Sequence, residues 1–147
     1  IKINNAKKMI KRRIDPFDIS KRLKCVGDDV WKELAERCMG CGGCYYACPT
    51  CHCFDVRDGF SDDIGKRRRY WDSCIFSGFT RMAGGINPRE TKESRIKQRY
   101  NCKFNYLFEM HRMFGCVGCG RCTNVCLGYI DMIEYLKRLN NRQKFKN

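Results

Sequence analysis

The stretch that decides the fold reads Cys38-Met39-Gly40-Cys41-Gly42-Gly43-Cys44-Tyr45-Tyr46-Ala47-Cys48-Pro49. A second stretch repeats its cysteine spacing 78 positions later and reads Cys116-Val117-Gly118-Cys119-Gly120-Arg121-Cys122-Thr123-Asn124-Val125-Cys126. Both follow the pattern C-x2-C-x2-C-x3-C. Most of the 13 cysteines in this chain of 147 residues therefore belong to one repeated motif.

This spacing is typical of bacterial ferredoxins, in which the fourth cysteine of each run ligates the cluster held by the other run. Cluster one is therefore predicted to be bound by Cys38, Cys41, Cys44 and Cys126. Cluster two is predicted to be bound by Cys116, Cys119, Cys122 and Cys48. Paired zinc sites are the alternative, but zinc ribbons use pairs of C-x2-C rather than this triplet with a fourth cysteine. Leu127 stands where proline would complete the second run, which predicts a local backbone change with intact ligation.

The other five cysteines leave two interpretations open. Cys51, Cys53, Cys74 and Cys102 are either buried thiols beside the clusters or the four ligands of a third metal or iron–sulfur site. Cys25 is interpreted as an ordinary thiol.

The chain is strongly basic, with 30 Lys and Arg against 16 Asp and Glu and a formal net charge of +14. Basic residues gather in 1–24, in 66–69 and in 137–147, whereas 38–53 contains no charged side chain. Part of the excess offsets the negative charge of the clusters. The rest is solvated surface, a docking surface for an acidic partner subunit, or a nucleic-acid surface.

The sequence predicts one domain in a reducing, cytoplasmic setting. Residues 1–13 lack the apolar core of a signal peptide, and no stretch approaches the length of a membrane span. We divide the chain into a basic lead (1–28), a dicluster domain (29–139) that contains a long insert (54–115), and a basic tail (140–147).

Helical patterns dominate the predicted elements. Asp28 or Asp29 is expected to cap a helix that ends near Arg37, and an amphipathic helix is expected over 131–141. Asn87 is expected to cap a helix over 88–113. Residues 54–88 read as loop, with no alternating strand pattern. The fold class is therefore mainly α, a helical-ferredoxin-like dicluster domain rather than the compact bacterial type.

No catalytic or nucleotide-binding pattern accompanies the cysteines. The chain shows no Ser/His/Asp or Cys/His arrangement, no paired carboxylates and no G-x-G-x-x-G after a strand. Electron transfer, with no bond chemistry of its own, is therefore the leading prediction. A nucleic-acid-associated protein with structural clusters is the alternative.

One longer series of motifs resembles a known family. Cys48-Pro49-Thr50-Cys51-His52-Cys53-Phe54-Asp55 is similar to a segment of the beta subunits of cytoplasmic NiFe sulfhydrogenases, which the related iron–sulfur subunits of anaerobic sulfite reductases share. Trp71-Asp72-Ser73-Cys74 and Met82-Ala83-Gly84-Gly85 are similar to the block that follows there, and Asn87-Pro88-Arg89 resembles the hydrogenase type.

The resemblance implies an iron–sulfur subunit with two 4Fe–4S clusters that relays electrons between a flavin-bearing subunit and a catalytic subunit. It implies a cytoplasmic hydrogenase, a sulfite or sulfur reductase, or a bifurcating complex, with no membrane partner. Two features depart from the family, because only 37 residues precede Cys38 and because Cys102 stands where the family tends to have histidine.

Overall fold

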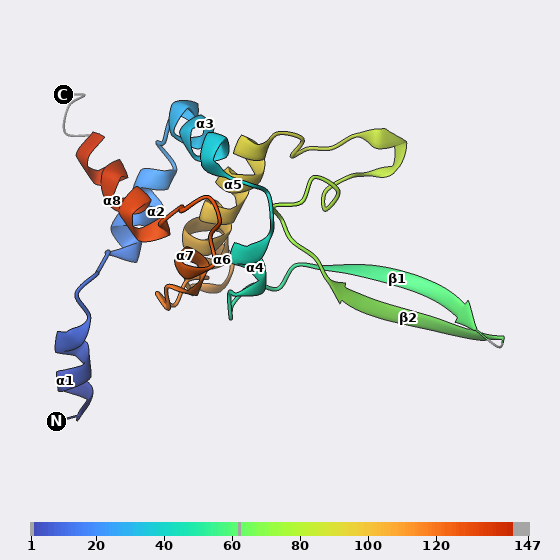
Figure 1. Cartoon of the computed structure of the whole chain (residues 1–147), viewed down its shortest axis with the longest axis horizontal. Coiled ribbons are helices and arrows are strands. Elements are labelled where there is room, and N and C mark those ends of the chain that lie inside the picture. Colours follow the sequence, from blue (N-terminus) through green and yellow to red (C-terminus); the bar gives the residue numbers. More distant parts are fainter. Residues whose placement is uncertain (1, 62, 143–147) are drawn as a thin grey trace.

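The computed structural model describes residues 2–61 and 63–142, and short helices form its body (Figure 1). The helices are α1 (Lys2–Met9), α2 (Pro16–Leu23), α3 (Asp28–Arg37), α4 (Gly43–Tyr46), α5 (Lys92–Asn101), α6 (Leu107–His111), α7 (Arg121–Asn124) and α8 (Met132–Arg142). A π-helical turn, η2 (Cys102–Tyr106), joins α5 to α6, and Ala83–Gly85 forms the 3-10 turn η1. The strands β1 (Phe54–Ser61) and β2 (Ile64–Trp71) form one hairpin. Among the described helices, none has the length and apolar character needed to cross a bilayer.

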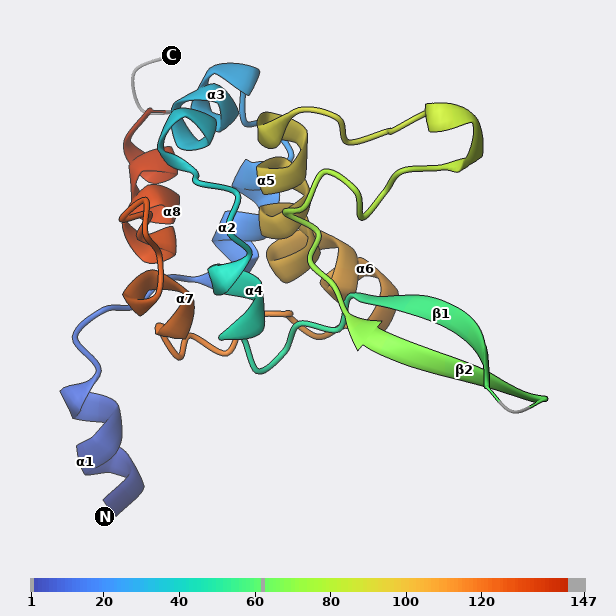
Figure 2. The same ribbon diagram turned by 45° about the vertical axis from the view of Figure 1, so that its right-hand side comes forward.

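The apolar core lies between α2, α3, α5 and α8, which Figure 2 shows grouped on one side of the molecule. Trp31 and Leu34 of α3 are buried against α5, where the rings of Trp31 and Tyr100 meet edge to face with centroids 5.6 Å apart. Leu136 of α8 is fully buried in the same cluster. Burial of these large side chains supplies the main driving force for the helical packing.

The basic lead contributes more to the core than the sequence predicts. Asp15 caps α2 by accepting a hydrogen bond from the backbone N–H of Phe17, and Pro16 occupies the first helical turn. Ile19 and Leu23 are buried in the core cluster. Only the earlier part of the lead, α1, stands apart from the body, and it has no buried residue (Figure 1).

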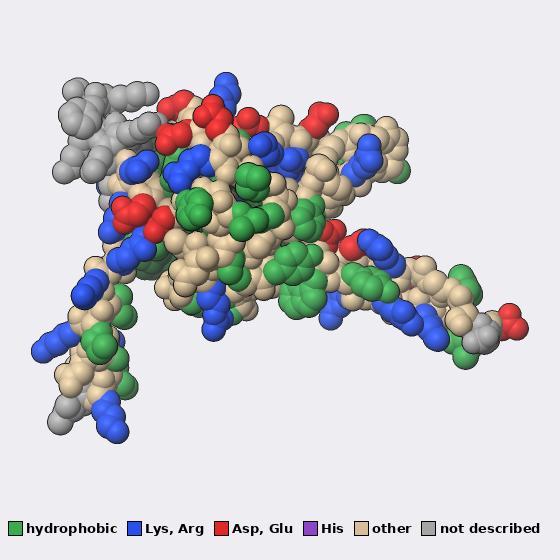
Figure 3. Space-filling model, viewed as in Figure 1, with side chains coloured by type: hydrophobic (Ala, Val, Ile, Leu, Met, Phe, Trp, Pro, Cys, Tyr) green, Lys and Arg blue, Asp and Glu red, His purple; other side chains and the backbone are tan. Residues whose placement is uncertain are grey.

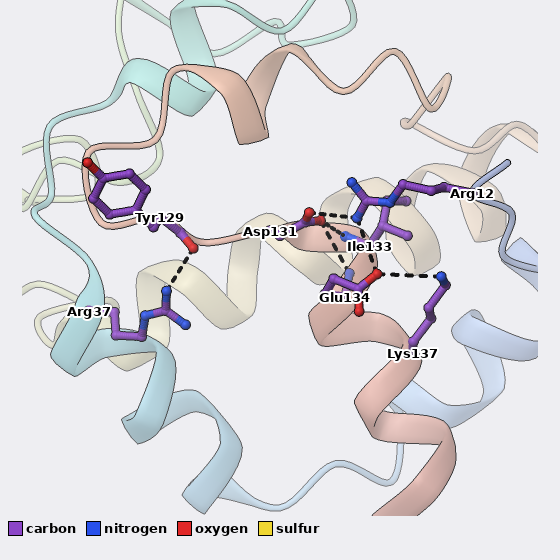
Figure 4. A network of polar contacts seen from close by, with 7 residues as sticks. All are labelled: Arg12, Arg37, Tyr129, Asp131, Ile133, Glu134 and Lys137. Carbon is purple, nitrogen blue, oxygen red and sulfur yellow. Dashed lines mark hydrogen bonds and ion pairs between the residues drawn. The ribbon is translucent and has the colours of Figure 1, made fainter. Parts of the chain in front are cut away.

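The helices predicted on either side of the cysteine runs are confirmed, with small changes at their starts. The N-cap of α3 is Gly27 instead of an aspartate, which leaves Asp28 in the first turn, where a carboxylate favours the helix dipole. Asp131 caps α8 by accepting from the N–H groups of Ile133 (3.0 Å) and Glu134 (3.2 Å), and it pairs with Arg12 at 2.6 Å (Figure 4). Of the predicted basic tail, residues 143–147 lie outside the described residues.

The long insert helix begins four residues later than predicted. Asn87 accepts a hydrogen bond from the N–H of Arg89 in a local turn, so its side chain caps no helix. Thr91 caps instead, by accepting from the N–H of Ser94 at 3.2 Å. The helical path then runs through α5, η2 and α6 until Arg112 adopts a left-handed conformation (φ 57°).

The prediction that 54–88 is loop is wrong for its first half, because β1 and β2 pair antiparallel from Phe54–Trp71 to Ser61–Ile64. Nearly every residue of the hairpin is exposed, and it projects away from the helices (Figure 1). Phe54, Val56 and Phe60 fall on alternate positions of β1, but β2 carries four successive cations over 66–69 and shows no alternation, so the sequence pattern does not predict a pair of strands.

Candidate metal centre

Both cysteine runs fold in the same way. Gly40 and Gly118 share a positive φ (66° and 68°), and so do Gly42 and Gly120 (73° and 75°). Glycine is the residue that adopts this backbone conformation without strain. Each second glycine is followed by a one-turn helix, α4 in the first run and α7 in the second, and these two helices pack together.

The two runs also end alike. The N–H of Cys51 donates to the carbonyl of Cys48 at 3.3 Å, and the N–H of Tyr129 donates to the carbonyl of Cys126 at 3.0 Å. Leu127 takes the same turn position that Pro49 takes in the first run, but the backbones diverge two residues later, where Tyr129 has a positive φ (51°) and Cys51 does not. The predicted local backbone change therefore lies next to Leu127, at Tyr129, and intact ligation stays a prediction.

The two runs enclose two cavities, and each cavity is lined by cysteines of both runs. The first cavity has an apolar wall formed by Ile75, Ile96, Ile130 and Met132. Its lining includes all four cysteines predicted for cluster one, Cys38, Cys41, Cys44 and Cys126, together with Cys122. The second cavity is lined by the four predicted for cluster two, Cys48, Cys116, Cys119 and Cys122.

A close backbone contact brings Cys126 to the first run. The backbone of Gly128 lies directly on the carbonyl of Arg37, where any Cβ at position 128 would overlap the carbonyl oxygen. The Arg37 side chain donates from Nη2 to the carbonyl of Tyr129 at 2.8 Å (Figure 4). Cys126 is thereby held beside the end of α3, from which Cys38 emerges.

A buried arginine lies between the two cavities and was missed from the sequence. Arg99 of α5 lines both cavities and is 4% exposed. Its Nη2 donates to the carbonyl of Cys44 at 2.7 Å, and its Nη1 donates to Cys51 Sγ at 3.4 Å. Burial alone would lower the pKa of Arg99, but the nearby thiols of Cys44 and Cys51 raise it overall. Arg99 is therefore a fixed positive charge beside both sets of cysteines.

A second buried cation, also missed, lies beside the second cavity only. Lys103 is 3% exposed, and its Nζ donates to Thr50 Oγ1 at 2.9 Å. Thr50 Oγ1 in turn donates to the carbonyl of Gly115 at 2.6 Å and lies 3.3 Å from Cys48 Sγ. The sequence does hold one indication that both cations face the core side of the helix. Arg99 and Lys103 lie four residues apart and are interleaved with the core residues Ile96 and Tyr100.

The cavities change the acidity of the thiols in opposite directions. Burial raises the pKa of Cys44 and of Cys116. A hydrogen bond from the Cys51 thiol lowers the pKa of Cys48 to about 3, and the same contact raises the pKa of Cys51. Since metals bind the thiolate, the lowered pKa of Cys48 favours its ligating form, whereas the raised pKa of Cys44 and of Cys116 means that metal binding there would displace a proton.

The remaining five cysteines have different surroundings. The thiols of Cys53 and Cys74 are hydrogen bonded to each other, which lowers the pKa of Cys53 to about 6 and raises that of Cys74. Cys51 is paired with Cys48, Cys102 is half-buried, and Cys25 is exposed. A third metal site on Cys51, Cys53, Cys74 and Cys102 stays a prediction.

The donor sets suit clusters better than single ions. Among the residues that the structure describes, no three His, Cys, Asp or Glu side chains converge closely enough to hold one metal ion. Zinc bound by four thiolates would need sulfur atoms about 3.8 Å apart, given its tetrahedral bonds of about 2.3 Å. A four-iron cluster is larger and is ligated at its corners, so thiols arranged around a cavity fit it.

Each cavity has one edge that reaches the surface, and the two edges are equivalent in sequence. Cys41 and Cys119, the second cysteines of their runs, are exposed. Beside them, Met39 and Val117 are 70% and 64% exposed. The molecule therefore offers two apolar surface patches, one over each cavity.

Comparison with known proteins agrees with this geometry. Over 109 residues the chain is 44% identical to Sulfhydrogenase 2 subunit beta of Pyrococcus furiosus, an alignment that covers 73% of this chain and 32% of that protein. The chain thus spans about a third of the length of this curated relative. No solved structure matches the chain. Residues 37–130, more than half of the chain, match the family model described as 4Fe-4S dicluster domain. With both cysteine runs inside that match, the chain belongs to the family of 4Fe-4S dicluster domain proteins.

Proposed function

We propose that this chain is the electron-transfer subunit of a multi-subunit oxidoreductase and holds two 4Fe–4S clusters. The observation that carries the proposal is the pair of cavities, each lined by three cysteines of one run and the fourth cysteine of the other. Cys122 and Arg99 line both cavities, so the two clusters would be neighbours inside one protein body. That arrangement suits passage of single electrons from one cluster to the other.

Each set of residues has a definite role in this proposal. The thiolates of Cys38, Cys41, Cys44 and Cys126 would hold cluster one, and those of Cys48, Cys116, Cys119 and Cys122 would hold cluster two. The clusters supply reversible one-electron reduction when bound. The apolar wall of the first cavity lowers the polarity around a bound cluster, which helps to set the cluster potential. The exposed edges at Cys41 and Cys119 give electrons one entry and one exit.

The named relative supports a place in a larger complex. It is a beta subunit of a sulfhydrogenase, and this chain aligns with about a third of it. We propose partners of two kinds, a flavin-bearing subunit and a catalytic subunit, in a hydrogenase, a sulfite or sulfur reductase, or a bifurcating complex. The cytoplasmic setting predicted from the sequence belongs to the same proposal.

The hairpin β1–β2 is the surface best suited to an acidic partner subunit. Figure 3 shows apolar and basic side chains along it, with acidic ones at its tip and base, and its exposed apolar residues include Phe60 (86%) and Trp71 (68%). Arg57 and Arg67 are paired with Asp55 and Asp58, but the neighbouring Arg68 and Arg69 form no ion pair in the described part of the chain. Two strands alone are marginally stable in water. An acidic and partly apolar partner surface would stabilise the hairpin and pair with its remaining cations.

Part of the positive charge lies where it could not serve the nucleic-acid alternative. Arg95, Arg99 and Lys103 are buried and do not contribute to a surface that could bind phosphates. The charge near the cavities instead matches the negative charge expected of thiolate-bound clusters.

Anaerobic purification of the chain with its partner subunits tests the function. Two clusters correspond to about eight iron atoms per chain, and three clusters would give about twelve. We expect about eight iron and eight sulfide per chain, with EPR signals of reduced 4Fe–4S clusters after dithionite treatment. Zinc without iron, or iron that cannot be reduced reversibly together with salt-sensitive binding to DNA or RNA, would refute the electron-transfer role.

A further inference from the structure

Three buried cations lie along one helical path beside the cavities. Arg95 and Arg99 belong to α5, and Lys103 lies four residues later in η2, so all three occupy one side of the helix. Their exposed fractions are 8%, 4% and 3%. Within residues 2–61 and 63–142, no carboxylate forms an ion pair with any of them. Buried charges are normally paired or bound to an anion, so this row calls for negative charge that the side chains do not supply.

The three cations differ in what their polar atoms contact. Arg95 is turned toward the loop before α5, where its Nη1 donates to the carbonyls of Arg89 and Glu90, and it lines neither cluster cavity. Lys103 reaches the second cavity only and is linked to Cys48 through Thr50. Arg99 lines both cavities, and its buried Nε, like that of Arg95, has no hydrogen-bond partner in the described part of the chain.

The negative charge of a bound cluster would compensate the buried positive charge of Arg99. An oxidised 4Fe–4S cluster with four thiolates carries a net charge of about −2, and its one-electron reduction makes that about −3. A fixed cation beside a cluster stabilises the reduced state more than the oxidised state and so raises the reduction potential. Apolar side chains line much of the first cavity, and an environment of low polarity strengthens the effect there.

We propose that Arg99 is a positioning residue that sets the reduction potentials of both clusters together, whereas Lys103 acts on cluster two alone. The inference rests on the proposed function, because it assumes that the two cavities hold clusters. Arg99 keeps both potentials high enough for one electron donor to reduce either cluster.

The test compares Arg99→Gln with Lys103→Gln and Arg95→Gln in the full chain purified anaerobically. Each variant is assayed for iron and sulfide and then titrated with dithionite and redox mediators under EPR. In Arg99→Gln we expect the ratio of reduced to oxidised cluster at a fixed potential to fall about tenfold for both clusters, equivalent to about 59 mV for a one-electron couple. Lys103→Gln is expected to shift one cluster only. Arg95→Gln, the matched buried control, is expected to shift neither.

Two fully loaded clusters with unchanged potentials in Arg99→Gln would overturn the inference and leave the proposed function intact. Failure of the wild-type chain to show reducible clusters would instead refute the proposed function. If Arg99→Gln does not retain iron, Arg99→Lys distinguishes a role of the charge from a role of the side-chain shape, because lysine keeps the positive charge. Restored iron with potentials close to wild type supports a role for the charge. Loss of iron in Arg99→Lys as well, beside a loaded Arg95→Gln, would assign Arg99 to packing and overturn the inference.

Discussion

Gly128 lies with its backbone against the carbonyl oxygen of Arg37, and this contact joins the second cysteine run to the end of α3. The contact leaves no room for a side chain at position 128. It brings Cys126 to the cavity that Cys38, Cys41 and Cys44 line. The shape of the first cavity therefore depends on one glycine that is 90 positions away from Cys38 in the sequence.

Substitution of this glycine should destabilise the protein. In Gly128→Ala the new Cβ would overlap the Arg37 carbonyl, and relief of that overlap requires a backbone shift. We expect a loss of about 1–3 kcal/mol in the free energy of unfolding, the range typical of overpacking. Denaturant unfolding of the iron-loaded protein measures it. Gly78→Ala is the control, because a Cβ there meets nothing within 4 Å. Equal stability of both variants would contradict the close contact.

Crossed ligation predicts which cluster each cysteine variant loses. Cys126→Ala and Cys41→Ala should both lose cluster one, because both residues line the first cavity. Each variant should therefore retain about four iron atoms and show the same residual EPR signal. Cys25→Ala, an exposed thiol outside both cavities, should retain the full iron content. Different residual signals in Cys126→Ala and Cys41→Ala would show that each run binds its own cluster.

Iron removal should weaken the whole fold. Without clusters, Arg99 and Lys103 remain buried with no compensating negative charge, which is costly in a protein interior. We expect anaerobic chelation of iron to lower the melting temperature and to reduce helical circular dichroism, with recovery when iron and sulfide are restored. An apoprotein that melts at the same temperature as the loaded protein would show that the helical core is stable without metal.

Shortening the hairpin should separate partner binding from folding. Replacement of residues 57–68 by a two-residue Asn-Gly turn joins the paired residues Val56 and Arg69. Because the removed residues are exposed, we expect iron content and stability to change little, the latter by no more than about 0.5 kcal/mol. The native complex with the partner subunits should become smaller or dissociate on size-exclusion chromatography. An intact complex would place the docking surface elsewhere.

The sequence was most informative where local chemistry determines structure. Cysteine spacing identified the eight cysteines that line the two cavities, and apolar periodicity identified α3 and α8. It was least informative where the environment is set by distant contacts. Arg99 and Lys103 carry charges that normally face solvent, so their burial could not be inferred without knowing that both cavities lie against α5 and η2.

Two further differences have local causes. The strands β1 and β2 are exposed on both faces, and only β1 has apolar residues at alternate positions, so its pairing partner gave no strand signal. Asn87 is of a residue type common at helix N-caps, but its side chain accepts a hydrogen bond from the N–H of Arg89 in a turn. The helix begins after Thr91, which is its N-cap. Asp15-Pro16 is a helix-start signal for α2, but it was overlooked because it lies within a strongly basic stretch.

The way the cavities are shared has a consequence for biosynthesis. A ribosome completes Cys38, Cys41 and Cys44 long before it reaches Cys126, so the nascent chain exposes three thiols with no fourth partner for most of its synthesis. The first cavity comes into existence only when α7 has emerged and packed against α4. Cluster insertion is therefore expected to follow translation of the second run. A chain truncated within the insert would lack a complete site for either cluster, and its thiols would be open to oxidation.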